Sequence, residues 1–151
     1  MKPEELSIGD WVNVLNYHYD GSPYVGQVDG ITKKHGTYYL QFGSALSAEI
    51  DRCKPIPITP EILERNGFKK VPQPKCANPF HWELASYEDD IQEPSMMLYC
   101  IKAFTTLFYG MFISINVPSA CETITFGKQV EYVHELQHAL HLCKIEKEIE
   151  L

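Results

Sequence analysis

Apolar and polar residues alternate over the first sixty positions, and glycine and proline repeatedly interrupt the alternation. A period of two is typical of strands, and the interruptions are typical of turns. Five short strands are predicted, at residues 8–15, 25–32, 37–42, 48–51 and 55–58. Residues 33–36 predict a hairpin turn between the second and third of these strands. So many short strands in so few residues predict a small SH3-like barrel over residues 1–58.

A short helix with a signal at each end is predicted at residues 59–66. Thr59 can cap its amino end, and Pro60 suits the first helical position because its missing N–H has no partner there in any case. Gly67 can adopt the left-handed conformation that ends a helix, so that Phe68 folds back onto it. This helix opens the second half of the chain.

The second half, residues 59–151, is predicted to be an α+β unit. The strands predicted in it lie at residues 82–87, 97–104, 111–117, 123–126 and 146–151. Residues 128–143 carry apolar side chains at a helical period and predict an amphipathic helix. The predicted fold class is therefore α+β, with an SH3-like barrel followed by an antiparallel sheet packed by the C-terminal helix.

The apolar run at residues 96–115 is long enough to cross a bilayer, but it contains Lys102 near its middle. A lysine there costs about 2.5–3.5 kcal/mol on insertion scales. The run is also rich in β-branched and aromatic residues and is interrupted by Gly110, so two buried strands around a turn are expected instead of a membrane span.

Composition and charge restrict the function only coarsely. Hydrophobic residues make up 44% and charged residues 22%, which is ordinary for a folded protein. The formal charge of −7 disfavours binding to nucleic acid. Five cysteines without a Cys-x-x-Cys pair favour reduced thiols, and the first residues lack an apolar signal core, so a cytoplasmic location is expected.

Residues 134–138 spell His-Glu-Leu-Gln-His, which matches the zinc-peptidase signature H-E-x-x-H. One helical turn separates His134 from His138, so both imidazoles can reach one Zn²⁺ while Glu135 serves as general base. The apolar stripe of the predicted helix lies on the opposite side, however. The histidines, His141 included, are therefore expected to face water.

A third ligand for catalytic zinc is also difficult to find. His141 lies about 10 Å from His134 along the helix axis, too far for both to bind one ion. The upstream histidines His18, His35 and His81 show no ligand spacing. We therefore predict no metal, no cofactor and no catalytic residue, and keep a zinc-dependent hydrolase using the 134–138 motif as the alternative.

Aromatic residues of the first sixty positions are the other candidates. A binding surface is predicted from Trp11, Tyr17, Tyr19, Tyr24 and Tyr38, since small barrels often bind extended peptides through such side chains. The alternative is that these aromatics fill a small core. The function favoured is a non-enzymatic interaction protein for an unknown protein or peptide, without nucleic acid or membrane, and with self-association as a further possibility.

Three blocks of the sequence carry a resemblance to a known family. They are Glu-Leu-x-Ile-Gly-Asp-Trp-Val at residues 5–12, Pro-Ile-Pro-Ile-Thr at 55–59 followed by Asn-Gly-Phe at 66–68, and Tyr-Val-His-x-Leu-Gln at 132–137. With these the chain resembles an uncharacterised family of small proteins from Bacteroides-type bacteria, often encoded among phage and mobile-element genes. In that family asparagine is common at the position of His138 and glutamine at that of Glu135. The resemblance implies that the zinc signature is an accident on a packing helix, and it implies no catalytic residue.

Overall fold

The computed structural model describes residues 1–15, 17, 21–72, 80–84, 95–103, 106–117, 120–124, 129–142, 145 and 147–151. The chain forms two compact units. The first consists of Met1–Pro57 with Tyr132–His134, and the second of Ile58–Glu131 with Glu135–Leu151.

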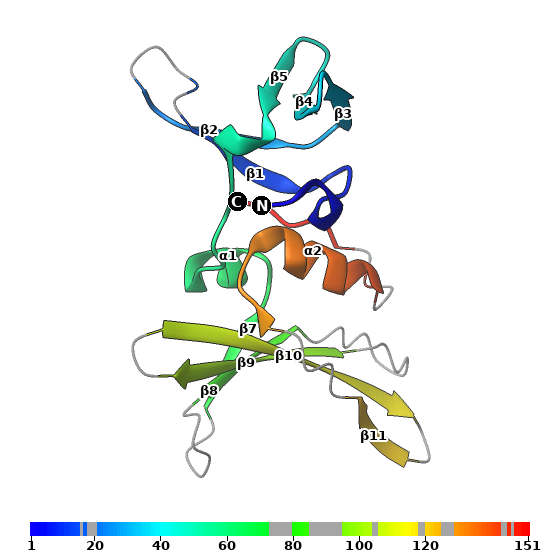
Figure 1. Ribbon diagram of the computed structural model, residues 1–151. Coiled ribbons are helices and arrows are strands. Elements are labelled where there is room, and N and C mark those ends of the chain that lie inside the picture. The colour runs from blue at the N-terminus through cyan, green and yellow to red at the C-terminus, as the bar shows by residue number, and fades with distance from the viewer. Residues whose placement is uncertain are drawn as a thin grey trace. The chain divides into compact units, whose positions relative to one another are not determined.

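The first unit contains two three-stranded antiparallel sheets (Figure 1). Its elements in chain order are η1 (Pro3–Glu5), β1 (Trp11–Val14), β2 (Tyr24–Gln27), β3 (Gly30–Lys34), β4 (Thr37–Phe42), β5 (Leu46–Glu49), η2 (Ile50–Arg52) and β6 (Cys53–Pro55). One sheet has the strand order β2-β1-β6 and the other β3-β4-β5. The described strands do not close into a barrel, so the finer prediction of an SH3-like barrel is not shown by the fold alone.

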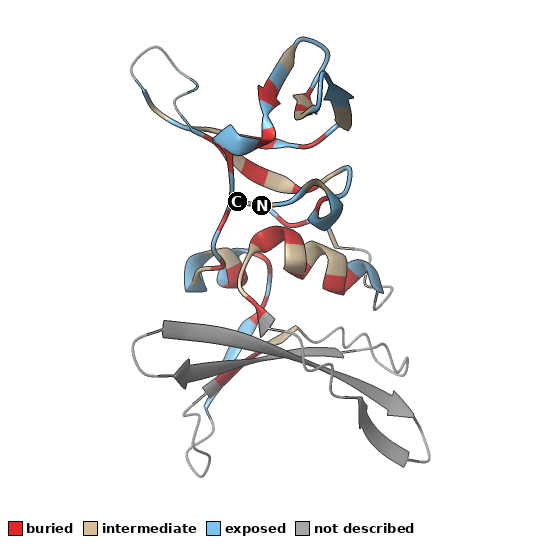
Figure 2. Ribbon diagram, viewed as in Figure 1, coloured by how far each residue is buried: buried red, intermediate tan, exposed pale blue. Residues whose placement is uncertain are grey.

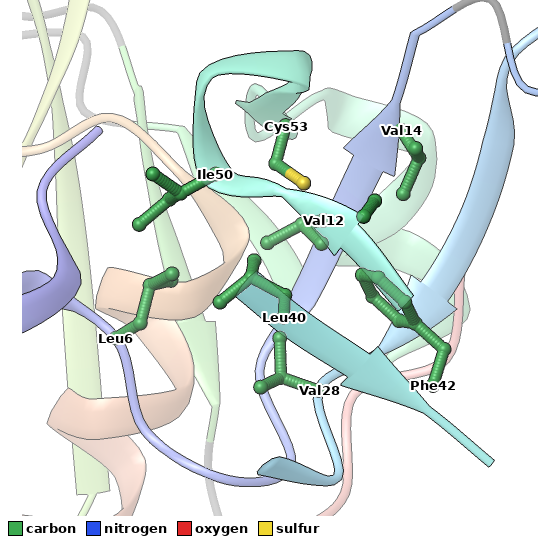
Figure 3. Close-up of a cluster of buried hydrophobic side chains, with 9 residues drawn as sticks. Leu6, Val12, Val14, Val28, Leu40, Phe42, Ile50 and Cys53 are labelled. Carbon is green, nitrogen blue, oxygen red and sulfur yellow. The ribbon is translucent and has the colours of Figure 1, made fainter. Parts of the chain in front are cut away.

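The alternation along the sequence sets which side chains enter the core of this unit. In β1, for example, Val12 and Val14 are fully buried, while Trp11 and Asn13, which alternate with them, are half-buried. The core cluster consists of Leu6, Val12, Val14, Val28, Leu40, Phe42, Ala48, Ile50 and Cys53 (Figure 3). Both sheets contribute to it, and this shared core holds them together.

The hairpin predicted at residues 33–36 is present between β3 and β4. His35 has φ 49° and Gly36 φ 87°, as a two-residue turn of the primed kind requires. The strand predicted at residues 25–32 is instead two strands, β2 and β3, that pair with different partners. The strands predicted at 48–51 and 55–58 are β5 and β6, each shifted by two or three residues toward the amino end.

The second unit contains a six-stranded sheet and helical segments (Figure 1). Its elements are α1 (Pro60–Arg65), β7 (Lys69–Pro72), β8 (Phe80–Leu84), β9 (Ser95–Ala103), β10 (Thr106–Val117), β11 (Ala120–Ile124), β12 (Gln129–Val130) and most of α2 (Val133–Leu142). The sheet order is β11-β10-β9-β8-β7, with β12 pairing β10, and every pair is antiparallel. The α+β class predicted from the sequence is confirmed.

Local signals placed the ends of α1 correctly. The Thr59 hydroxyl accepts a hydrogen bond from the N–H of Ile62 at 3.3 Å, and Pro60 is the first helical residue. Gly67 has φ 76°, and the N–H of Phe68 donates to the carbonyl of Leu63 at 3.0 Å. Each end of this helix therefore uses the capping contact that the sequence predicted.

Two predictions for the second half need correction. The turn expected around Gly110 is not there, because Gly110 lies within β10 opposite Tyr99. The closing strand expected at residues 146–151 is not found among the described residues of that segment, 147–151. There the side chain of Asn66 takes the place of a neighbouring strand, accepting from the N–H of Glu150 at 2.9 Å and donating to its carbonyl at 2.7 Å. No helix among the described residues is both long and apolar enough to cross a membrane.

Candidate functional site

Three aromatic rings form a continuous row from the surface to the core of the first unit. Tyr17 is 40% exposed, and its ring centroid lies 5.0 Å from that of Tyr24. Tyr24 is half-buried and meets Phe42 edge-on at 5.9 Å, with 83° between the ring planes. The row is thus anchored by a buried phenylalanine and ends in an exposed tyrosine, an arrangement suited to contact with a partner.

Exposed aliphatic side chains lie close to this row in the sequence. Leu15, directly after β1, is 38% exposed, and Val25, in the middle of β2, is 43% exposed. Val25 lies opposite Asn13 in the β1–β2 ladder. Val25 therefore points to the face of β2 opposite to that of Tyr24, because neighbouring side chains of a strand alternate between its faces. We name the Tyr17–Tyr24 ring pair the β2 surface.

The structure separates the other members of the predicted surface from this pair. Trp11 is half-buried opposite Gln27 at the far end of the same ladder. Tyr38 belongs to the β3–β4–β5 sheet, where the Nζ of Lys33 lies 4.8 Å from its ring centroid. Tyr19 lies outside the described residues. Of the five predicted aromatics, the structure therefore brings Tyr17 and Tyr24 together.

Leu15 and Val25 were missed by sequence reasoning because each stands beside a buried residue of a strand. Val25 alternates with the buried Gly26 and Leu15 follows the buried Val14, so both fall in the phase that normally holds polar residues. For Val25, the available signal was an apolar residue at a strand position whose alternation predicts a polar one.

The histidines of the 134–138 motif do not form the water-facing row that was expected. His134 is only 4% exposed, and its ring stacks on Tyr132 at 5.9 Å with 11° between the planes. His138 is half-buried, and His141 is exposed. Figure 2 shows the same change along α2, from a buried beginning to an exposed end. The expectation was wrong for His134.

The error has a structural reason, since α2 begins at Val133 and not at residue 128. The chain entering the helix is held in place by a β-bridge between Pro57 and Tyr132 and by the N–H of Val133, which donates to the carbonyl of Ile56 at 2.9 Å. His134 belongs to this enclosed first turn. A helical wheel drawn over residues 128–143 cannot represent that entry.

Glu135, the candidate general base, is engaged in a structural hydrogen bond. Its Oε2 accepts from the backbone N–H of Glu131 at 2.8 Å. A carboxylate at the third position of a helix that accepts from the preceding backbone stabilises the helix start and also faces the positive end of its dipole. In the alternative of a zinc hydrolase, this same carboxylate would have to polarise a zinc-bound water, so the hydrogen bond to Glu131 competes with that role.

The candidates for a third zinc ligand do not converge with the motif in the part of the chain that the structure describes. His35 occupies the exposed β3–β4 turn, and His81 lies in β8 with its Nε2 4.0 Å from Oε2 of Glu83. Among the described residues no group of three or more His, Cys, Asp or Glu side chains is placed to hold a metal ion. His18 and the cysteines other than Cys53 fall outside the described side chains.

Comparison with known proteins adds no relative. No protein-family model, no curated protein and no solved structure matches the chain. The resemblance drawn from the three sequence blocks therefore stays a prediction, and the function has to be argued from the geometry.

Proposed function

We propose that this chain is a non-enzymatic interaction protein whose first unit is an SH3-like module that binds an extended peptide of a partner protein. The strand order supports the SH3-like assignment. Two three-stranded sheets, β2-β1-β6 and β3-β4-β5, share one core, and the short η2 turn precedes the last strand. Tyr17 lies in the sequence between β1 and β2, and small barrels commonly bind peptides through exposed aromatic residues.

The observation that carries the proposal is the Tyr17–Tyr24 ring pair at 5.0 Å, which ends in the 40% exposed Tyr17. Exposed tyrosines held by buried neighbours supply large contact areas at a small entropic cost, which is why they are enriched in binding interfaces. A cytoplasmic location and an association with mobile elements belong to the proposal through the sequence alone.

Selection from a phage-displayed library of random dodecapeptides against the full chain tests the proposal. Selected peptides are expected to bind wild type and to lose about tenfold in affinity with Tyr17→Ala, as truncation of an interface tyrosine does. Tyr17 is preferred to Tyr24, because truncation of Tyr24 would also remove packing against Phe42. Leu142→Ala, at a 78% exposed position of α2, is the matched control.

The proposal fails if no selected peptide depends on Tyr17, or if Tyr17→Ala abolishes the cooperative unfolding of the first unit. The second outcome would mean that the ring pair is part of the core, which was the alternative explanation of the aromatic content.

A zinc-dependent hydrolase remains the second candidate because of one observation, the burial of His134. Elemental analysis of untagged protein, dialysed against metal-free buffer, tests it. One zinc per chain that is lost in His138→Asn would support the hydrolase and oppose a purely structural role for the motif.

A further inference from the structure

Edge strands of sheets need protection against unwanted pairing, and proteins usually supply it with lysine, other charges or proline. Six described strands of three residues or more lie at a sheet edge: β2, β3, β5, β6, β7 and β11. Five of them carry such a residue: Lys33 and Lys34 in β3, Glu49 in β5, Lys54 and Pro55 in β6, Lys69, Lys70 and Pro72 in β7, and Glu122 in β11. The sixth, β2, has the sequence Tyr-Val-Gly-Gln and carries none.

The backbone of β2 is also oriented for pairing. The N–H of Val28 donates to the carbonyl of Asp10 at 2.9 Å, which continues the β1–β2 register. Because amides two residues apart point to the same side of a strand, Gly26 also faces β1, whereas Val25 and Gln27 face the open edge. No backbone hydrogen bond outside the ladders involves Val25 or Gln27 among the described residues.

The charge around β2 selects the kind of segment that can add to it. Between Lys2 and Lys33 the sequence has no lysine or arginine, and it has five acidic residues: Glu4, Glu5, Asp10, Asp20 and Asp29. Asp10 is buried, and a cation lies nearby, since Nη2 of Arg52 donates to the carbonyl of Leu15 at 3.2 Å. Asp29 is exposed two residues after β2, and its Oδ2 accepts a hydrogen bond from the backbone N–H of Gly43. The whole chain has a charge of −7, so a basic segment is attracted and a second copy of the chain is repelled.

We propose that β2 is a docking edge to which an extended basic segment of a partner protein adds as a further strand. This inference rests on the proposed function and specifies its binding mode and partner class. The outward N–H and C=O groups of Val25 and Gln27 supply the main-chain hydrogen bonds. The exposed Val25 side chain contacts apolar residues of the added strand, and the Tyr17–Tyr24 rings on the opposite face of β2 attract its basic residues.

Fluorescence anisotropy with a fluorescein-labelled heptapeptide of alternating arginine and valine tests the proposal on the full chain. The decisive pair of variants is Val25→Pro and Val25→Ala. Proline removes the outward N–H and leaves the ladder to β1 intact, as edge strands allow. Alanine keeps the N–H and shortens the side chain.

The arginine–valine peptide is expected to bind wild type, and Val25→Pro is expected to weaken it about tenfold relative to Val25→Ala. A glutamate–valine heptapeptide should not bind. If Val25→Pro lowers the melting temperature strongly, a probe with N-methyl groups on alternate amides replaces the variant and should lose binding to wild type.

Three outcomes would overturn the docking edge: no binding of the arginine–valine peptide, equal binding by the two Val25 variants, or equal binding of the acidic peptide. Sedimentation of wild type as a dimer that Val25→Pro converts to a monomer would replace the partner by a second copy. Library-selected peptides that depend on Tyr17 but ignore Val25→Pro would refute the edge and leave the proposed function standing. Edge binding that ignores Tyr17→Ala would refute the aromatic contact instead.

Discussion

Gly26 is the residue on which the geometry of the β2 surface depends most directly. A Cβ atom at this position would lie 2.5 Å from Cε1 of Tyr24 and 2.9 Å from Cδ1 of Phe42. Both distances are shorter than any normal carbon–carbon contact, so Gly26→Ala must displace the rings. Phe42 is buried in the core, and the Tyr24 ring is the one with room to move outward.

Two opposing terms set the expected magnitude. Replacing a strand glycine with alanine stabilises by about 0.5–1 kcal/mol when the site has space, because the unfolded chain loses freedom. Overpacking a filled site costs about 1–3 kcal/mol. With two ring contacts under 3.0 Å the second term should dominate, and we expect a net loss of about 1 kcal/mol or more in the free energy of unfolding.

Gly30→Ala is the matched control. Gly30 is also a strand glycine of the first unit, and its Cβ would lie 2.6 Å from Oε1 of Gln41. That atom is the end of a flexible side chain that can rotate away, so Gly30→Ala should be neutral or slightly stabilising. Urea unfolding followed by Trp11 fluorescence, with all variants in a Trp82→Phe background, reports on the first unit.

A double-mutant cycle isolates the ring contact. In a Tyr24→Ala background the largest clash is gone, so Gly26→Ala should cost less than it does in wild type. Equal costs in both backgrounds, or a Gly26→Ala protein at least as stable as wild type, would refute the close packing of Tyr24 over Gly26. An equal loss in Gly30→Ala would show that alanine itself, and not the rings, is responsible.

Three further predictions concern other contacts. Glu135→Ala should lower the free energy of unfolding by about 0.5–2 kcal/mol because the N–H of Glu131 loses its acceptor. Glu135→Gln should retain most of this stability, because its amide oxygen can still accept, and thermal unfolding distinguishes the two variants. Asn66→Ala should cost about 2–3 kcal/mol and expose the C-terminal segment to carboxypeptidase, because Glu150 loses both backbone partners; undiminished resistance would refute this. Burial raises the pKa of the Cys53 thiol to about 11, so it should resist iodoacetamide at pH 8. The thiol of the unfolded chain has a pKa of about 8.5, so the contribution of Cys53 to stability is complete below that pH and falls as the pH rises toward 11. Cys53→Val should make this decline in stability smaller.

Structural features that depend on a few neighbouring residues were predictable from the sequence. The ends of α1 follow from Thr59, Pro60 and Gly67, and the β3–β4 turn follows from His35 and Gly36, because each depends on contacts between near neighbours. Buried and less buried residues also alternate along β1 and at the end of β4, as the period of two in the sequence does. These features need only backbone preferences and a period of two.

Features set by distant contacts were not predictable in the same way. His134 is buried because the residues before α2 bridge to Pro57 and Ile56, more than seventy positions earlier in the chain. The last residues look like a strand, yet the backbone of Glu150 pairs with an amide side chain, that of Asn66. Helical and strand periods describe a segment in isolation, and neither records what lies against it.

The same distinction explains why the aromatic content of the first unit suggested a surface without locating it. Aromatic residues are suited equally to a core and to an interface, and only the register separates the two uses. Tyr24 meets Phe42 on the inner side, and Val25, one residue later, is exposed on the other side with its amide toward the open edge. One four-residue strand therefore contributes both to the core and to the surface. Because β2 lies at a sheet edge, the absence of lysine and proline from it indicates an edge that is not protected against pairing. A binding role for β2 is thus an argument from topology, and the Val25→Pro experiment tests that topology more directly than any change of aromatic residue.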